Sequence, residues 1–128
     1  MTKPNDKQMT IQELKDMVVK FRDERGWRKH HTPKNLAMSI AIEAAELMEL
    51  FQWDDYSERD QQKIADEMSD ILTYCFNLAD ILGIDIASSF VSKLERVKLK
   101  YPVELFNQKQ DRSEDYYHIK QAYRKDKK

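Results

Sequence analysis

Helix-breaking residues and cysteines are scarce in this chain of 128 residues, which has only 2 glycines, 3 prolines and 1 cysteine. Because glycine and proline interrupt helices, their scarcity in a chain of this length favours a mostly helical fold. A single cysteine excludes an internal disulfide framework and fits a reducing compartment. Cys75 falls in an apolar helical row, so we interpret it as a small buried hydrophobic residue. The length is sufficient for one domain with a hydrophobic core.

Long hydrophobic runs and an excess of one charge are also missing. No apolar stretch approaches the roughly 20 residues that span a bilayer. The first residues are polar, without the apolar segment of a signal peptide. We therefore expect a soluble, cytoplasmic protein with no membrane partner. Charged residues make up 35% of the chain, yet the net charge is -1, so overall electrostatics do not favour nucleic-acid binding.

Helix-start signals are plentiful in the first half of the chain. Thr10 and Glu13 form a capping-box pattern ahead of a first amphipathic helix, which we expect to end near Gly26. Thr32 and Pro33 suit the N-cap and first position of a second helix, which the pattern extends to about Trp53.

Two further helices are predicted in the second half. Ser57 or Asp60 can cap the third, and Gly83 is suited to the left-handed position that ends it. Asp85 can cap the fourth, which Pro102 interrupts. Short connections favour antiparallel neighbours, so the sequence predicts an all-α four-helix bundle.

The predicted bundle covers residues 10–106 and follows a flexible N-terminus at 1–9. The stretch 107–128 is charged and polar, with interleaved tyrosines. We favour a solvated tail there. A peripheral helix and a segment that docks on a partner subunit are the alternatives.

Two pairs of carboxylates mark the second and third predicted helices. Glu43 and Glu46 are three residues apart, as are Glu67 and Asp70, and this spacing puts both members on nearly the same helix face. The first glutamate of each pair lies in an otherwise apolar row; the rows are Leu36, Ile40, Leu47 and Leu50, and Ile64, Ile71, Tyr74, Leu78 and Ile81. Burying an unpaired carboxylate costs several kcal/mol or shifts its pKa. Because both helices carry one glutamate in an otherwise apolar row, the pattern indicates a cation shared between them.

The ligand types indicate a hard cation, Mg²⁺ or alternatively Mn²⁺, because all four are carboxylates. A di-iron site needs Glu-x-x-His on two helices, and His30, His31 and His118 all lie outside these helices. Mg²⁺ held by carboxylates keeps positions open for water and phosphate, which suits nucleoside triphosphate hydrolysis. The sequence has no glycine-rich phosphate loop, so the metal would have to bind the phosphates.

Aromatic side chains flank the carboxylate pairs and offer surfaces on which a nucleotide base can stack. Trp27 precedes the second helix, Trp53 closes it, and Tyr74 lies one turn beyond Asp70. A core or interface role is the competing interpretation for each of them. Basic residues that can reach phosphate oxygens look individually like ordinary surface; they are Arg28, Lys34, Lys93, Lys98 and Lys100.

Longer motifs resemble those of a known family. They are HxPxNL at 31–36, ELxELFQW at 46–53, ExSDxLxY at 67–74, and SK at 92–93 followed by YP at 101–102. Together they make the chain similar to the MazG-like all-α nucleoside triphosphate pyrophosphohydrolases, and within these to the dCTP pyrophosphatases. The resemblance covers about Ile11 to Leu105, nearly the whole predicted bundle.

The resemblance implies hydrolysis between the α- and β-phosphates, giving a monophosphate and pyrophosphate, with dCTP or a modified dCTP as substrate. It implies that Glu43, Glu46, Glu67 and Asp70 are catalytic and hold Mg²⁺, with one of the carboxylates as general base. It implies that His31, Trp27 and Trp53 form the base pocket, with Tyr74 and Lys93 near the substrate. It also implies a homodimer or homotetramer.

The chain departs from this family at Val97, where an asparagine is common, so the base and sugar preference stays open. Two alternative functions also stay open. One is a phosphoribosyl-ATP type pyrophosphohydrolase of the same superfamily. The other is a non-catalytic helical module whose carboxylates bind a basic partner.

Overall fold

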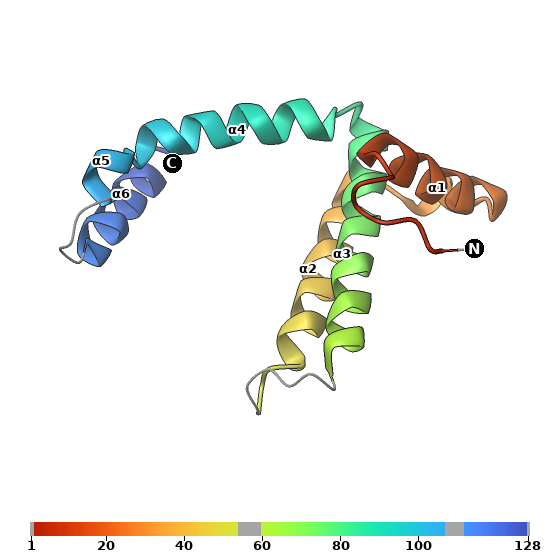
Figure 1. Cartoon of the computed structure of the whole chain (residues 1–128). Helices are drawn as coiled ribbons and strands as arrows, with labels where there is room; N and C mark the ends of the chain where they lie inside the picture. Colours follow the sequence, from red (N-terminus) through yellow and green to blue (C-terminus); the bar gives the residue numbers. More distant parts are fainter. Residues whose placement is uncertain (1, 54–59, 107–111, 128) are drawn as a thin grey trace. The chain divides into compact units, whose positions relative to one another are not determined.

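The computed structural model describes residues 2–53, 60–106 and 112–127, and within these ranges all regular structure is helical (Figure 1). The helices are α1 (Ile11–Glu24), the 3-10 helix η1 (Trp27–His30), α2 (Pro33–Glu49), α3 (Gln61–Leu82), α4 (Ile86–Lys100), α5 (Val103–Phe106) and α6 (Ser113–Lys125). The predicted all-α class is confirmed. The chain divides into two compact units, Met1–Ile86 and Ala87–Lys128. The single bundle over 10–106 stays a prediction.

The predicted caps begin the first two helices. The Thr10 hydroxyl accepts a hydrogen bond from the Glu13 N–H at 3.1 Å, and Glu13 Oε2 accepts one from the Thr10 N–H at 2.7 Å. This reciprocal capping box satisfies two donors that a helix start leaves unpaired. At α2 the Thr32 hydroxyl accepts from the Asn35 N–H at 3.2 Å, and Pro33 occupies the first helical position.

The helix ends agree with the sequence at α3 and differ at α2. Gly83 ends α3 with φ 65°, a left-handed conformation that glycine adopts without a Cβ penalty. The predicted extension of α2 to Trp53 is wrong, because α2 ends at Glu49. The next three N–H groups donate to carbonyls three residues earlier, so the helix tightens into turns.

The start of α3 lies immediately after Asp60. The side chain of Asp60 makes no capping hydrogen bond but lies 4.0 Å from the ammonium of Lys63. The alternative cap, Ser57, is outside the described residues.

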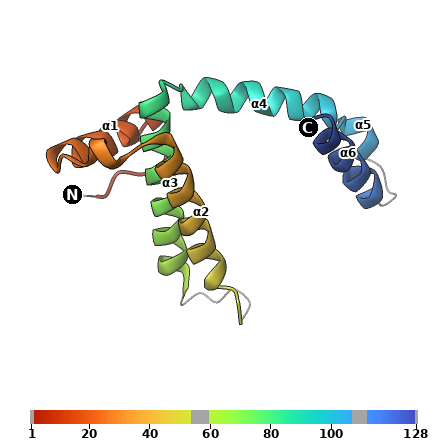
Figure 2. The same cartoon turned by 180° about the vertical axis from the view of Figure 1, so that it is seen from behind.

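In the first unit, α2 and α3 run side by side in opposite directions, as Figure 1 and Figure 2 both show. The two predicted rows are buried or half-buried along their whole length. Leu36 is 1% exposed, and Phe76 and Ala79 complete the buried apolar core among the described residues. Cys75 is half-buried, and burial raises the pKa of its thiol. The pairing of α2 with α3 therefore sets the carboxylate-bearing faces against each other.

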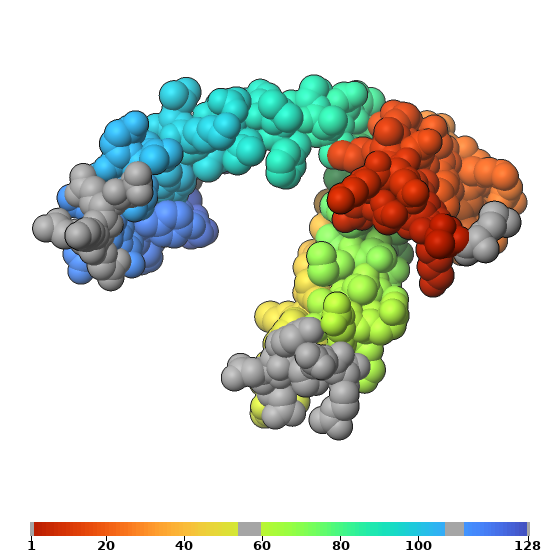
Figure 3. Space-filling view, in the orientation of Figure 1, coloured from red at the N-terminus to blue at the C-terminus, as the bar shows by residue number. Residues whose placement is uncertain are grey.

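Helix α1 packs on the C-terminal part of α3 (Figure 3). An ion pair that the sequence did not indicate fixes this contact. Arg22 is 2% exposed, and its guanidinium lies 2.8 Å from a carboxylate oxygen of Asp80 on α3 and 2.8 Å from one of Asp23. A buried guanidinium is stable only when such partners neutralise it.

The second unit comprises most of α4 together with α5 and α6, which lie at the C-terminal end of α4 (Figure 1). Residues 113–125 form a helix where the sequence favoured a solvated tail. Aromatic packing explains the difference. The Tyr101 ring stacks on that of Tyr116 at 5.1 Å between centroids and meets Phe106 edge-on at 5.9 Å. Tyr116 thus anchors α6 through its ring, whereas Tyr117 of the same helix is 59% exposed.

No single helix in the described part of the chain has the length and apolar character to cross a membrane. Only α3 and α4 taken together, as a pair with a bend between them, have the length and composition of a membrane span. Several large apolar side chains are exposed in the single chain, among them Met17, Phe90 and Leu99. Exposed apolar faces of this kind favour association. Oligomerisation stays a prediction.

Candidate active site

Three of the four predicted metal ligands meet where α2 faces α3. Glu43, Glu46 and Glu67 each offer a carboxylate oxygen, and these oxygens lie within 4.8 Å of one another. We call these three residues the acidic cluster. Glu43 and Glu67 are half-buried and Glu46 is exposed. The cluster forms because the i, i+3 spacing turns both α2 carboxylates toward the antiparallel neighbour.

The carboxylates of the cluster disturb one another. The pKa of Glu43 is raised by burial and then by the negative charge of Glu46, with smaller contributions from Asp70 and Glu67. The pKa of Glu67 is also raised, first by burial and then by the charges of Glu46 and Asp70. Both shifts have the direction expected of like charges that share a partly desolvated site. A cation at the cluster would relieve this repulsion.

The fourth predicted ligand, Asp70, is not a member of the 4.8 Å group. It is close enough for its charge to raise the pKa of both Glu43 and Glu67. Asp70 and Glu43 also line the same neighbouring pocket. The structure therefore puts Asp70 at the border between the acidic cluster and that pocket.

The pocket beside the cluster has a volume of about 240 Å³. Helices α1, α2 and α3 and the segment around η1 all contribute to it. We call it the aromatic pocket; its lining residues are Phe21, Arg22, Trp27, His31, Glu43, Asp70, Thr73, Tyr74 and Asn77. Aromatic, cationic and amide groups thus converge next to a set of carboxylates, as in a small-molecule site.

Three of the five predicted substrate-binding residues, Trp27, His31 and Tyr74, line the aromatic pocket. The Trp27 ring is held edge-on to Phe21, with centroids 5.7 Å apart. Gly26 immediately before it has φ 64°, which allows the tight turn between α1 and η1.

The other two predicted residues are not brought into this pocket. Trp53 is 85% exposed and is not among the described lining residues. Lys93 belongs to the second unit, where it lines a different pocket, formed by α4 and α6.

Sequence reasoning missed four residues that the structure adds to the lining: Phe21, Arg22, Thr73 and Asn77. Asp70, Thr73 and Asn77 are spaced +3 and +4, so the periodicity of α3 was a signal that could have identified the last two. Asn77 is 2% exposed and its amide nitrogen donates to the Thr73 carbonyl at 3.0 Å. No comparable local signal marked Arg22, because its partner Asp80 is distant in sequence.

Three buried polar atoms in this region have no hydrogen-bond partner among the described residues. They are Nδ1 of His31, Oε2 of Glu67 and Oδ1 of Asn77. Buried polar groups are nearly always paired, and an unpaired one needs an explanation such as a bound ion or ligand. The unpaired Glu67 oxygen, the mutual repulsion of the cluster and its all-oxygen donor set fit a hard divalent cation.

Comparison with known proteins agrees with this chemistry. The MazG-like family model matches residues 38–118, more than half of the chain. A solved pyrophosphatase from Archaeoglobus fulgidus is 41% identical and superposes with a TM-score of 0.69, covering 78% of this chain and 99% of that one. Residues 38–118, which the family model matches, include the acidic cluster.

Curated relatives are similar at lower identity. Over 104 aligned residues, the chain is 31% identical to the dCTP pyrophosphatase 1 of Homo sapiens and 32% identical to that of Bos taurus. These alignments cover 75% of this chain, and 61% and 62% of the human and bovine proteins. The chain thus spans about three-fifths of the length of the curated relatives it matches.

Proposed function

Because this chain belongs to the MazG-like family, we propose that it is a Mg²⁺-dependent nucleotide pyrophosphohydrolase. Its substrate is a nucleoside triphosphate, dCTP or a modified dCTP. Water cleaves the bond between the α- and β-phosphates and gives the monophosphate and pyrophosphate. One observation carries the proposal: Glu43 belongs both to the acidic cluster and to the lining of the aromatic pocket. A site for a cation and a site for a base therefore share a residue.

The relatives support the reaction class and the choice of nucleotide. The mammalian proteins are named dCTP pyrophosphatase 1, and the archaeal structure is described as a pyrophosphatase. The archaeal chain is matched almost over its full length.

The acidic cluster would hold the cation, with Asp70 at its border. When bound, a divalent cation supplies charge neutralisation at phosphate oxygens and makes water more acidic. The chain's own contribution is the orientation of the carboxylates by two antiparallel helices. A carboxylate of this set that is not engaged in binding the cation accepts the proton of the attacking water.

The aromatic pocket would hold the base. Trp27 and Tyr74 offer ring faces, and stacking on such rings stabilises a bound base by about 1–3 kcal/mol. His31 and Asn77 offer polar atoms that no described protein group satisfies. Binding the base here puts the phosphates beside Glu43, since that residue borders both sites.

The experiment is pyrophosphate release from a panel of canonical and modified ribo- and deoxynucleoside triphosphates, with Mg²⁺ or with EDTA. We expect release from dCTP with Mg²⁺, the matching monophosphate as the second product, and no release with EDTA. Faster release from another base keeps the reaction and overturns the substrate. Release only from a phosphoribosylated nucleotide supports the related phosphoribosyl-ATP activity, and the absence of all release contradicts the proposed function.

A matched pair of variants ties the activity to the cluster. Glu46→Gln removes one charge from the acidic cluster without changing its shape. Asp66→Asn makes the same change at an exposed carboxylate of α3, which accepts a hydrogen bond from Gln62 at 2.8 Å. Turnover should be lost in the first variant and kept in the second; equal turnover in both would contradict the assignment.

A further inference from the structure

One buried polar side chain of the first unit is only half paired. Among the described residues, the buried polar or charged side chains are those of Arg22 and Asn77, each 2% exposed. The guanidinium of Arg22 is neutralised by Asp23 and Asp80. By contrast, Oδ1 of Asn77 has no hydrogen-bond partner in the described part of the chain. An acceptor left unpaired in the interior is destabilising, so this oxygen needs an explanation.

The orientation of the Asn77 amide is fixed by the helix that carries it. Its nitrogen donates to the Thr73 carbonyl at 3.0 Å. A carbonyl oxygen can only accept, so a flipped amide would set two acceptors against each other. The nitrogen therefore faces the backbone of α3, and the oxygen is the polar atom of this side chain that is left for a ligand.

Asn77 lies in the aromatic pocket, away from the proposed metal site. It shares the lining with Asp70, Thr73 and Tyr74 of the same helix. Asn77 follows Asp70 by two helical turns, or about 10 Å along the axis of α3. Since Asp70 borders the acidic cluster, Asn77 marks the end of this α3 face that is farther from the cluster.

The shape of a pyrimidine nucleotide determines which part of the base comes near Asn77. The sugar and phosphates are attached at ring atom N1, and ring position 4 is directly opposite. With the phosphates at the acidic cluster, position 4 is the part of the ring farthest from the cluster. Cytosine carries an amino group there, which donates, whereas uracil and thymine carry a carbonyl, which only accepts.

We propose that Asn77 selects cytosine over uracil and thymine, because its Oδ1 accepts a hydrogen bond from the 4-amino group of the base. This inference rests on the proposed function, which puts the phosphates at the acidic cluster. A uracil in the same position sets its 4-carbonyl against Oδ1 and leaves both oxygens unpaired. The nearest uracil donor, N3–H, lies one ring position away, so its use requires the base to shift. Sites with buried polar groups discriminate strongly against ligands that leave those groups unpaired.

The first test needs no variant. It is calorimetric titration of dCMP, dUMP and the matching 2-pyrimidinone nucleotide into the full chain, in EDTA. The 2-pyrimidinone nucleotide has only hydrogen at position 4, so it lacks both the amino group and the carbonyl. We expect dCMP to bind about tenfold more tightly than either of the others, because each of them leaves Oδ1 unpaired. Equal binding of dCMP and the 2-pyrimidinone nucleotide, or absent binding of all three, would overturn the proposal.

The second test is Asn77→Leu, which replaces the amide by an apolar side chain of similar size. Binding of dCMP should weaken about tenfold and binding of dUMP should stay within twofold of the parent. The Tm should not fall, because the Thr73 carbonyl keeps its backbone hydrogen bond within α3 and the unpaired oxygen is removed. Unchanged selectivity in Asn77→Leu would overturn the proposal and leave Asn77 a purely structural role.

A matched control is Gln62→Leu, which makes the same kind of change at an exposed amide of α3 outside the pocket. It should keep the parental preference for dCMP within twofold. An equal loss of preference in Gln62→Leu and Asn77→Leu would also contradict the role of Asn77.

Steady-state kinetics with Mg²⁺ separate this proposal from the proposed function. The kcat/KM of the parent should be about tenfold higher for dCTP than for dUTP, and the two values should become nearly equal in Asn77→Leu. Equal kcat/KM for dCTP and dUTP in the parent would overturn only the selection by Asn77. Selective binding of dCMP without hydrolysis of any triphosphate would overturn only the proposed function.

Discussion

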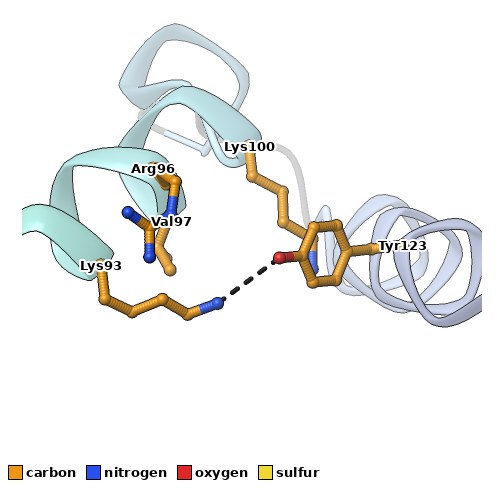
Figure 4. Close-up of a pocket in the computed structure, with 5 residues that line it drawn as sticks. All are labelled: Lys93, Arg96, Val97, Lys100 and Tyr123. Carbon is orange, nitrogen blue, oxygen red and sulfur yellow. Dashed lines mark hydrogen bonds between the residues drawn. The ribbon is translucent and has the colours of Figure 1, made fainter. Parts of the chain in front are cut away.

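Two regions of the molecule carry charge of one sign but differ in their surroundings: the acidic cluster of α2 and α3, and a basic pocket of α4 and α6. The basic pocket is lined by Lys93, Arg96, Val97, Lys100 and Tyr123 (Figure 4). In the acidic cluster two of the three carboxylates are half-buried, and burial is the first cause of their raised pKa values. In the basic pocket most groups are exposed, and a hydrogen bond from a neighbouring cation is the first cause of the lowered pKa of Tyr123.

This difference determines how each site responds to its solvent. Salt screens exposed charges within about 8–10 Å at physiological ionic strength, whereas it screens partly buried charges much less. A counter-ion at the acidic cluster is therefore expected to bind directly to the carboxylates. The repulsion among the exposed cations of the basic pocket should instead weaken steadily as the salt concentration rises.

The largest expected effect is on turnover at the acidic site. Asp70→Asn should lower kcat about 1,000-fold, because cation-assisted charge stabilisation is worth several kcal/mol and each 1.36 kcal/mol is tenfold in rate. Lys98→Gln, a charge change in the other unit, should leave kcat within twofold. Single-turnover measurements with the proposed substrate check this, and an Asp70→Asn variant with near-parental kcat would remove Asp70 from the site.

The next largest effect is on the free energy of unfolding and concerns the ion pair between Arg22 and Asp80. Asp80→Asn leaves the 3%-exposed Arg22 side chain without its partner on α3. We expect a loss of about 3 kcal/mol in the free energy of unfolding. The control is Glu24→Gln, which breaks the exposed pairs with Lys20 at 3.7 Å and with Arg25 at 3.8 Å and should cost less than about 0.5 kcal/mol. Urea denaturation measures both; similar small losses would show that Arg22 does not depend on Asp80.

The aromatic pocket beside the cluster predicts unequal roles for the two tryptophans. Trp27→Leu removes a stacking face and should raise KM about tenfold, in line with 1–3 kcal/mol per stacked base. Trp53→Leu changes a residue outside the described lining and should alter KM less than twofold. An equal rise in both variants would indicate that Trp53 also reaches the base, contrary to the single-chain geometry.

Without a metal, the carboxylates of the acidic cluster repel one another, so the stability of the fold should depend on pH. Since the folded-state pKa of Glu67 is raised, stability falls as pH rises above the ordinary glutamate value, and the loss is complete above the raised pKa. Glu67→Gln removes this penalty, so in EDTA its Tm should exceed that of the parent at neutral pH. The difference should vanish near pH 3.5, about a unit below the ordinary glutamate pKa, where Glu67 is protonated in both states. A lower Tm of the variant at neutral pH would contradict the sign of the shift.

The smallest effect is spectroscopic and concerns the basic pocket. Tyr123 should ionise at a lower pH than an ordinary tyrosine, and this lowering of its pKa should shrink in Lys93→Gln, which removes the first cause of the shift. Ultraviolet absorbance titration, with Tyr123→Phe to identify the signal, measures this. A Tyr123 with the ordinary pKa of a tyrosine would show that the cations do not act on it.

The acidic cluster was predictable from the sequence and the basic pocket was not. Glu43 and Glu46 mark one helix face by local spacing, and the apolar rows around Glu43 and Glu67 predicted that these faces pack together. Capping patterns at Thr10 and Thr32 likewise gave the helix starts that the structure confirms. Local periodicity therefore identified most of what positions the metal site.

Long-range contacts account for what the sequence did not predict. Arg22 meets Asp80, and Lys93 meets Tyr123, across long stretches of chain, and no local pattern pairs such residues. The lysines of α4 looked like ordinary surface because their convergence depends on α6. That helix was itself predicted as a tail, since Tyr116 gains a packing surface only when it meets Tyr101.

The most direct test of the account is thermal unfolding of the parent and Glu46→Gln, each with Mg²⁺ and with EDTA. If the acidic cluster holds the cation, Mg²⁺ stabilises the parent by mass action, by about 2.7 kcal/mol at a hundred times the Kd. The Tm of the parent should then rise with Mg²⁺ and that of Glu46→Gln should not. A parent that does not respond to Mg²⁺, or an equal rise in both proteins, would contradict the assignment of the cation to this cluster.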